Sequence, residues 1–151
     1  MGDTILNKVY YGIVKKLLKE KKLLRTILVL TITDGRPTHG TGSTIEQIFK
    51  QGEAHLIEAI NKCVRTFEKS DYGKFGICFS FAQIGTDKDA SEYFGRLDGY
   101  DYIGKNIDCT SEYHMEKAEC LRKTGHILTD AEWVNKIIIG PIDPSYDDMD
   151  E

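Results

Sequence analysis

The stretch Ile27-Leu28-Val29-Leu30-Thr31-Ile32-Thr33-Asp34-Gly35-Arg36-Pro37-Thr38 decides the fold. Its first seven residues form an almost uninterrupted apolar run, mostly aliphatic, and an Asp-Gly turn ends it. A short run that is apolar on both faces and bounded by turn residues is typical of a buried central strand in a parallel sheet. Ligands of open α/β sheets bind at the carboxyl ends of the strands. Asp34, directly after the run, is therefore the best single candidate for a site residue.

Composition excludes several classes of protein. The chain has 151 residues and a net charge of -4, which argues against nucleic-acid binding because such proteins usually carry an excess of Lys and Arg. No apolar run approaches the roughly 20 residues that a membrane span requires. Four cysteines lie far apart, without a CxxC pair, and we expect reduced thiols in a cytoplasmic protein rather than disulfides or a zinc site. They are Cys63, Cys78, Cys109 and Cys120.

The remaining chain alternates between helical and strand patterns. Apolar residues at helical spacing predict four helices, with Gly52 as a break or irregularity in the second and with Thr129-Asp130-Ala131-Glu132 as a capping box before the last. Residues 112–123 fit either a helix or a loop. The predicted helices are 4–24, 45–67, 87–97 and 130–139, and the further strands are 75–84 and 103–109.

This order predicts an α/β fold, a three-layer Rossmann-like sandwich with a mostly parallel sheet. Parallel strands joined by right-handed crossovers place helices on both faces of such a sheet. Only three strands can be found, so the sheet is expected to be incomplete. We assign residues 1–142 to this domain and residues 143–151 to an acidic tail.

Several motifs in their order along the chain resemble one family. They are Gly2-Asp3-Thr4 before an amphipathic helix, Asp34-Gly35-Arg36-Pro37-Thr38 after the strand, Phe79-Ser80-Phe81-Ala82-Gln83-Ile84-Gly85, and Trp133 to Ile139 followed by Gly140-Pro141. Together they resemble the carboxyl-terminal half to two-thirds of a von Willebrand factor type A (vWA) domain. The resemblance is greatest to the intracellular type found in fungi and protists.

This resemblance implies a non-enzymatic module for protein–protein interaction. The family's metal-ion-dependent adhesion site takes a DxSxS loop, a Thr and an Asp, and it binds an acidic residue of the partner through a divalent cation. Thr4 matches the Thr and Asp34 matches the Asp, whereas no DxSxS occurs in the sequence. We therefore expect Mg²⁺ or Mn²⁺ binding to be weak or absent. The expected binding surface comprises the loops Gly2–Thr4, Gly35–Ser43 and Gly85–Lys88.

Other interpretations of the same residues stay open. Thr4 can be a plain helix cap, and Asp34 can bond the backbone of its own turn. The chain can also be a small α/β enzyme, a hydrolase or phosphoryl-transfer domain, that uses Asp34 at the strand end. A third alternative is a truncated vWA fragment, which would expose an apolar sheet edge beside Ile27–Ile32 and could form homodimers by pairing of that edge.

Further candidates have simpler explanations. His39, in the Gly-rich loop after Asp34, is expected to be an exposed loop residue rather than a ligand. Cys63 and Cys78 lie in apolar patterns, where inert buried thiols are expected. Three carboxylates with irregular spacing, unlike a calcium loop, are expected to be solvated loop residues. They are Asp98, Asp101 and Asp108.

Overall fold

The computed structural model describes residues 5–20, 25–38 and 40–143. The chain divides into two compact units. The first comprises Met1–Ile27 and Arg36–Ile77, and the second comprises Leu28–Gly35 and Cys78–Glu151. Thr4, His39 and most of the predicted acidic tail lie outside the described residues.

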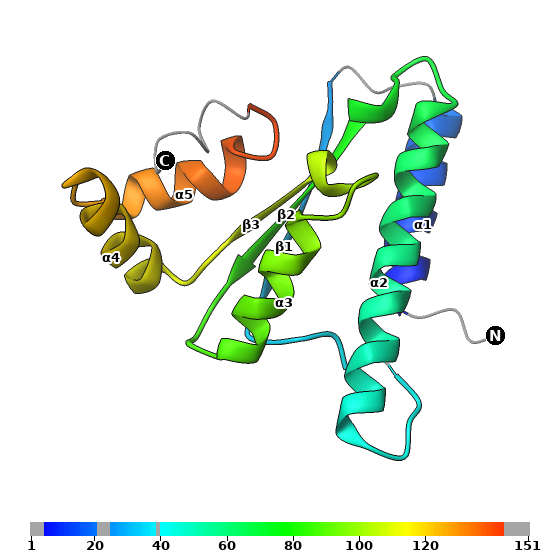
Figure 1. Cartoon of the computed structure of the whole chain (residues 1–151). Helices are drawn as coiled ribbons and strands as arrows, with labels where there is room; N and C mark the ends of the chain where they lie inside the picture. Colours follow the sequence, from blue (N-terminus) through cyan, green and yellow to red (C-terminus); the bar gives the residue numbers. More distant parts are fainter. Residues whose placement is uncertain (1–4, 21–24, 39, 144–151) are drawn as a thin grey trace. The chain divides into compact units, whose positions relative to one another are not determined.

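Two helices make up most of the first unit: α1 (Ile5–Glu20) and α2 (Ile45–Glu68). They lie side by side (Figure 1), and the Lys62 ammonium of α2 is 4.3 Å from the centre of the Tyr11 ring of α1. A short 3₁₀ turn, η1 (Lys74–Gly76), follows α2. The buried side chains of α2 recur every three or four residues, as expected for one face of a helix. They include Leu56, Ala59, Ile60, Cys63, Val64 and Phe67.

Helix α2 is continuous through Gly52, so the predicted break is wrong. Glycine in a helix interior costs about 1 kcal/mol relative to alanine, which a helix of this length with a buried face can offset. Gly52 itself is buried in that face. The start of the helix follows its sequence signal, because the Thr44 hydroxyl accepts the backbone N–H of Gln47 at 3.2 Å.

A three-stranded parallel sheet forms the centre of the second unit. Its strands are β1 (Ile27–Thr33), β2 (Ile77–Gln83) and β3 (Ile107–Thr110), in the order β1-β2-β3. On one side, the register pairs Ser80 with Asp108 and Ala82 with Thr110. On the other, the Ile84 N–H donates to the Thr33 carbonyl at 2.9 Å. The predicted α/β class with a parallel sheet is confirmed.

The strand predicted to be central is an edge strand. All seven residues of β2 are buried, whereas 43% of Leu30 and 63% of Ile32 in β1 are exposed. The prediction for β1 was wrong because an apolar run indicates a strand but not the number of its neighbours. Among the described residues, β2 is the strand that has a neighbour on both sides.

Helices cover both faces of this sheet. The first, α3 (Lys88–Asp98), packs on the face that carries Phe81, whose ring stacks on Phe94 at 6.0 Å. The last, α5 (Asp130–Ile139), contacts β3, and its end at Gly140 lies against Asp108. Asp108 is on the opposite face from Phe81, because alternate residues of a strand point to opposite faces and Phe81 is in register with Cys109. The second unit is therefore a small three-layer, Rossmann-like sandwich.

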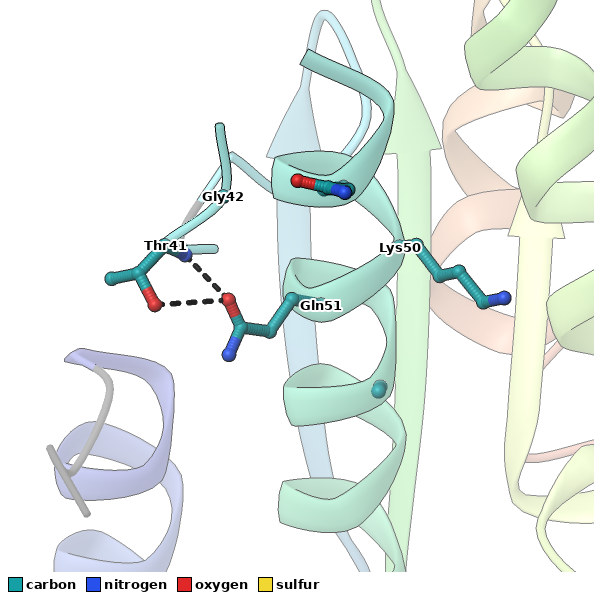
Figure 2. Close-up of a pocket in the computed structure, with 6 residues that line it drawn as sticks. Thr41, Gly42, Lys50 and Gln51 are labelled. Carbon is teal, nitrogen blue, oxygen red and sulfur yellow. Dashed lines mark hydrogen bonds between the residues drawn. The ribbon is translucent and has the colours of Figure 1, made fainter. Parts of the chain in front are cut away.

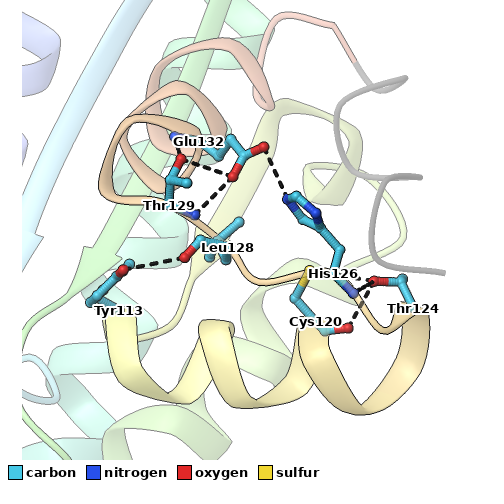
Figure 3. Close-up of polar contacts among 7 residues, drawn as sticks. All are labelled: Tyr113, Cys120, Thr124, His126, Leu128, Thr129 and Glu132. Atoms are coloured by element: carbon cyan, nitrogen blue, oxygen red, sulfur yellow. Dashed lines mark hydrogen bonds and ion pairs between the residues drawn. The ribbon is translucent and has the colours of Figure 1, made fainter.

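The segment that fits either a helix or a loop by sequence is a helix, α4 (Tyr113–Thr124). The predicted capping box before α5 is confirmed. Figure 3 shows the Thr129 side chain and backbone N–H bonded to the Glu132 carboxylate, at 2.8 Å each, and His126 bonded to the other oxygen of that carboxylate at 3.0 Å. These bonds fix the entry of the chain into α5.

None of the helices in the described ranges is both long and apolar enough to cross a membrane.

Candidate functional site at the carboxyl edge of the sheet

Asp34 follows β1 at the carboxyl edge of the sheet, and its side chain is exposed. The hydrogen bonds of its turn are made by the preceding residue: the Thr33 hydroxyl donates to the Gly35 carbonyl at 3.2 Å and accepts the Gly35 N–H at 3.3 Å. Within the described part of the chain, no hydrogen bond or ion pair engages the Asp34 carboxylate. The alternative in which Asp34 bonds its own turn is therefore not observed, and its carboxylate faces solvent.

The loop after β2 shares this edge with Asp34, because the Ile84 N–H bonds the Thr33 carbonyl. Its anchor is Gln83, which is 1% exposed. The Gln83 amide donates to the carbonyls of Gly85 and Asp87, at 3.3 and 3.0 Å, and accepts the Ser91 hydroxyl at 3.0 Å. A buried amide with its groups bonded in this way fixes the conformation of the loop. Gln83 belongs to the motif Phe79–Gly85, but no local sequence signal identifies it as a loop anchor.

Asp87, the second carboxylate of this edge, has a structural role. It is the N-cap of α3, and its Oδ1 accepts the N–H groups of Asp89 at 2.9 Å and Ala90 at 3.4 Å. A carboxylate at this position also interacts favourably with the positive end of the helix dipole. Asp87 is thus occupied by capping, and Asp34 is the carboxylate of the edge that is available to a partner.

The described residues do not fit a resident Mg²⁺ ion. Magnesium takes near-octahedral oxygen coordination, usually with one or two carboxylates and several waters held in place by their surroundings. In the described ranges, no group of three or more His, Cys, Asp and Glu side chains could hold a metal ion. Asp34 would contribute a single carboxylate, and Thr4 lies outside the described residues. The pairing of Thr4 with Asp34 as metal ligands therefore stays a prediction.

The cysteines are free, and two of them are unreactive by environment. Burial raises the pKa of the Cys63 thiol to about 11, against an opposing effect of the Lys62 charge, and burial also raises the pKa of Cys78. The thiolate is the nucleophilic form of cysteine, so both side chains are poor nucleophiles at neutral pH. The prediction of inert buried thiols at these positions is confirmed.

One predicted carboxylate lies elsewhere than expected. Asp108 is 5% exposed on β3 rather than in a solvated loop, because the end of α5 covers it. It shares its face of the sheet with Ser80 and Thr110, which are 0% and 1% exposed. The hydroxyls of Ser80 and Thr110 have no hydrogen-bond partner among the described residues. Asp98 and Asp101 are exposed, as predicted, although Asp98 is the last residue of α3 rather than a loop residue.

A shallow open recess lies on the first unit, between the Gly-rich loop and the start of α2. Figure 2 shows Gln51 bonded to the backbone N–H and the hydroxyl of Thr41, with Gly42 and Lys50 also lining the recess. The side-chain oxygens of Gln47 and Gln51 accept hydrogen bonds from Ser43 and Thr41 and so hold the loop on the helix. The recess is therefore a weaker candidate for a binding site than the edge that carries Asp34.

No protein-family model, curated protein or solved structure matches this chain.

Proposed function

We propose that this chain is a non-enzymatic protein–protein interaction module of vWA type, and that its partner contacts the carboxyl edge of the sheet at Asp34. The observation that supports this proposal is the exposed Asp34 carboxylate, which is held at the end of a strand and takes no part in its own turn. Proteins usually recognise their partners through polar side chains that a rigid scaffold holds in place and that make no hydrogen bonds within the protein itself.

The neighbouring loop supplies the rest of the proposed surface. Gln83 holds its backbone from within, so the loop can meet a partner with little loss of conformational entropy. Ile84 is 47% exposed beside the Thr33 carbonyl and adds an apolar contact. A carboxylate next to an exposed aliphatic side chain on a fixed backbone resembles the mixed polar and apolar surface of transient interfaces.

The chemistry of Asp34 alone favours a basic group on the partner. A partner's acidic residue, which the family resemblance implies, would need a cation to bridge two carboxylates, and the described residues do not fit one. A direct charge-assisted bond between Asp34 and a Lys or Arg needs no metal ion. We therefore propose an interaction that does not require a divalent cation.

A retention experiment with matched variants tests the proposal. The immobilised chain, its Asp34→Lys variant and its Asp101→Lys variant are exposed to the same protein mixture, in Mg²⁺ and in a chelator. Asp101 is the matched control, since it is an exposed carboxylate in the turn between α3 and β3, away from the carboxyl edge. We expect specific proteins to be retained by the wild type and by Asp101→Lys, and lost with Asp34→Lys.

Two results would contradict the proposal. If all three chains retain the same proteins, Asp34 is not part of the binding surface. If retention by the wild type disappears in the chelator, the interaction depends on a cation that the proposal leaves out.

A further inference from the structure

The two edges of the sheet differ in how they are protected against pairing. Strand β3 has four residues, carries Asp108, and has three of its residues buried. Strand β1 has seven residues, none of them charged and none of them proline. Edge strands usually avoid association through short length, charged side chains, proline or bulges. Strand β1 has none of the first three features, so its outer edge can accept another strand.

The backbone groups at that edge can be assigned. Because the Thr33 carbonyl accepts a bond from Ile84, the backbone of Thr33 faces β2. Backbone polar groups alternate in direction along a strand, so those of Leu28, Leu30 and Ile32 face the outer edge. In the order β1-β2-β3, no strand of the described residues lies on that side. Three residues with outward N–H and C=O groups therefore stand in a row.

We propose that a second copy of this chain pairs with β1 in antiparallel fashion about a twofold axis at Leu30. A twofold pair must join outward-facing residues to outward-facing residues. Leu30 is the middle residue of Ile27–Thr33, so this axis is the one that overlaps the full strand. Leu30 then faces Leu30 of the second copy, and Leu28 faces Ile32 of the second copy. The outward groups of all three residues are bonded, and the two sheets join into one.

Charge complementarity favours a second copy of the chain as the partner and antiparallel pairing as the direction. The uncharged segment Thr26–Thr33 is bounded by Arg25 at its start and by Asp34 at its end. Antiparallel pairing brings the positive end of each strand to the negative end of the other copy. Parallel pairing would instead place like charges together, which opposes association. The exposed side chains of Leu30 and Ile32 also become cross-strand apolar pairs, which stabilise an antiparallel edge.

Sedimentation over a dilution series, with the full chain, tests the dimer. We expect a concentration-dependent monomer–dimer equilibrium for the wild type and its loss in Ile32→Lys, because a charge on the edge strand opposes pairing. Ile127→Lys is the matched control: Ile127 is 59% exposed but lies between α4 and α5, outside the sheet. Circular dichroism establishes that the variants are folded. If the wild type stays monomeric at all concentrations, the proposal is overturned, and the β1 edge would then be open to a strand of another protein. A dimer that persists in Ile32→Lys also overturns the proposal.

Disulfide trapping tests the register. In a Cys109→Ser background, which removes the one partly exposed native thiol, we compare Leu30→Cys with Ile32→Cys under mild oxidation. Two Leu30 positions lie about 5.5 Å apart across the proposed axis, within disulfide reach. Two Ile32 positions lie about 13 Å apart along the strand and are out of reach. We expect covalent dimers from Leu30→Cys alone. Crosslinking of Ile32→Cys, or failure of Leu30→Cys to crosslink, overturns the register.

Discussion

The Glu116 carboxylate and the Lys136 ammonium lie 2.9 Å apart and join α4 to α5, with 9% and 15% of their side chains exposed. The other oxygen of Glu116 accepts the backbone N–H of Ser111 at 2.9 Å. The Ser111 carbonyl in turn accepts the indole N–H of Trp133 at 3.1 Å. One polar cluster thus connects α4, α5 and the segment after β3, and it positions the carboxyl end of β3.

The substitution Lys136→Met should strongly destabilise the protein. It leaves the Glu116 carboxylate nearly buried without its cation, and breaking such a pair from one side typically costs about 3–5 kcal/mol. Chemical unfolding of the purified chain measures this cost. Lys123→Met is the control, since Lys123 pairs with Glu119 at 3.3 Å on the surface and should lose less than about 1 kcal/mol. If Lys136→Met and Lys123→Met lose the same free energy of unfolding, burial does not strengthen the effect of breaking the Glu116–Lys136 pair.

The stability of the protein should fall in acid through Glu132. Hydrogen bonds from the backbone N–H and the hydroxyl of Thr129, together with His126, lower the pKa of Glu132 from 4.5 to about 2. A lowered pKa in the folded state means that the ionised group stabilises the fold above pH 4.5. That contribution is lost as the pH falls from about 4.5 to about 2. Glu132→Gln, which keeps the box geometry but cannot ionise, should lack this part of the acid dependence.

Unfolding curves at several pH values measure the effect. The gap in the free energy of unfolding between the wild type and Glu132→Gln should be present at neutral pH and should close toward pH 2. Asp130→Asn serves as a control in the same helical turn, because Asp130 is exposed. A gap that stays constant with pH would show that the Glu132 charge is not linked to folding.

Local signals in the sequence predicted local structure well. The apolar run Ile27–Thr33 became a strand, and Thr129 with Glu132 formed the capping box. Helix α4 was ambiguous for a physical reason. Its buried face carries Glu116 and Cys120, so a charged residue interrupts the apolar stripe that identifies a helix.

Long-range features could not be predicted from the same signals. Burial of Asp108 depends on the end of α5, which lies more than thirty residues later in the chain. The edge position of β1 depends on the number of strands in the sheet, and an apolar run does not encode that number. At the candidate site, the position of Asp34 at a strand end followed from the sequence. The hydrogen bonds that Thr33 makes within the turn could not be predicted from the sequence. A hydroxyl and a carboxylate are both good acceptors in turns, so Thr33 and Asp34 were equivalent candidates.

Gln83→Leu should destabilise the protein by about 1–3 kcal/mol, because it removes the partner of two loop carbonyls and of the Ser91 hydroxyl. The loop should also open more often, so trypsin should cleave faster after Lys88, which follows it. Limited proteolysis and chemical unfolding measure the two effects. Gln51→Leu is the control, since Gln51 holds a different loop through Thr41. Unchanged cleavage after Lys88 in Gln83→Leu would contradict the anchoring role of Gln83.

Magnesium should not stabilise the protein through Asp34. A single carboxylate does not hold the rigid oxygen shell that this ion requires, so the thermal midpoints of the wild type and of Asp34→Ala should respond equally to added Mg²⁺ or Mn²⁺. Thermal unfolding with and without each ion provides the measurement. A rise in midpoint that is present in the wild type and missing in Asp34→Ala would establish a metal site and would restore the bridging of a partner's carboxylate.

Arg36→Lys should destabilise the first unit although it keeps the charge. The Arg36 guanidinium stacks 4.5 Å from the centre of the Phe49 ring and bonds Glu53 at 2.8 Å, with 11% of its side chain exposed. Lysine lacks the planar group that stacks and donates at the same time, so we expect a loss of about 1–2 kcal/mol. Arg122→Lys, at a side chain that is 72% exposed, should lose almost nothing in the same unfolding experiment. If the two variants are equally stable, charge alone accounts for the contribution of Arg36, and the stacked geometry on α2 adds nothing to it.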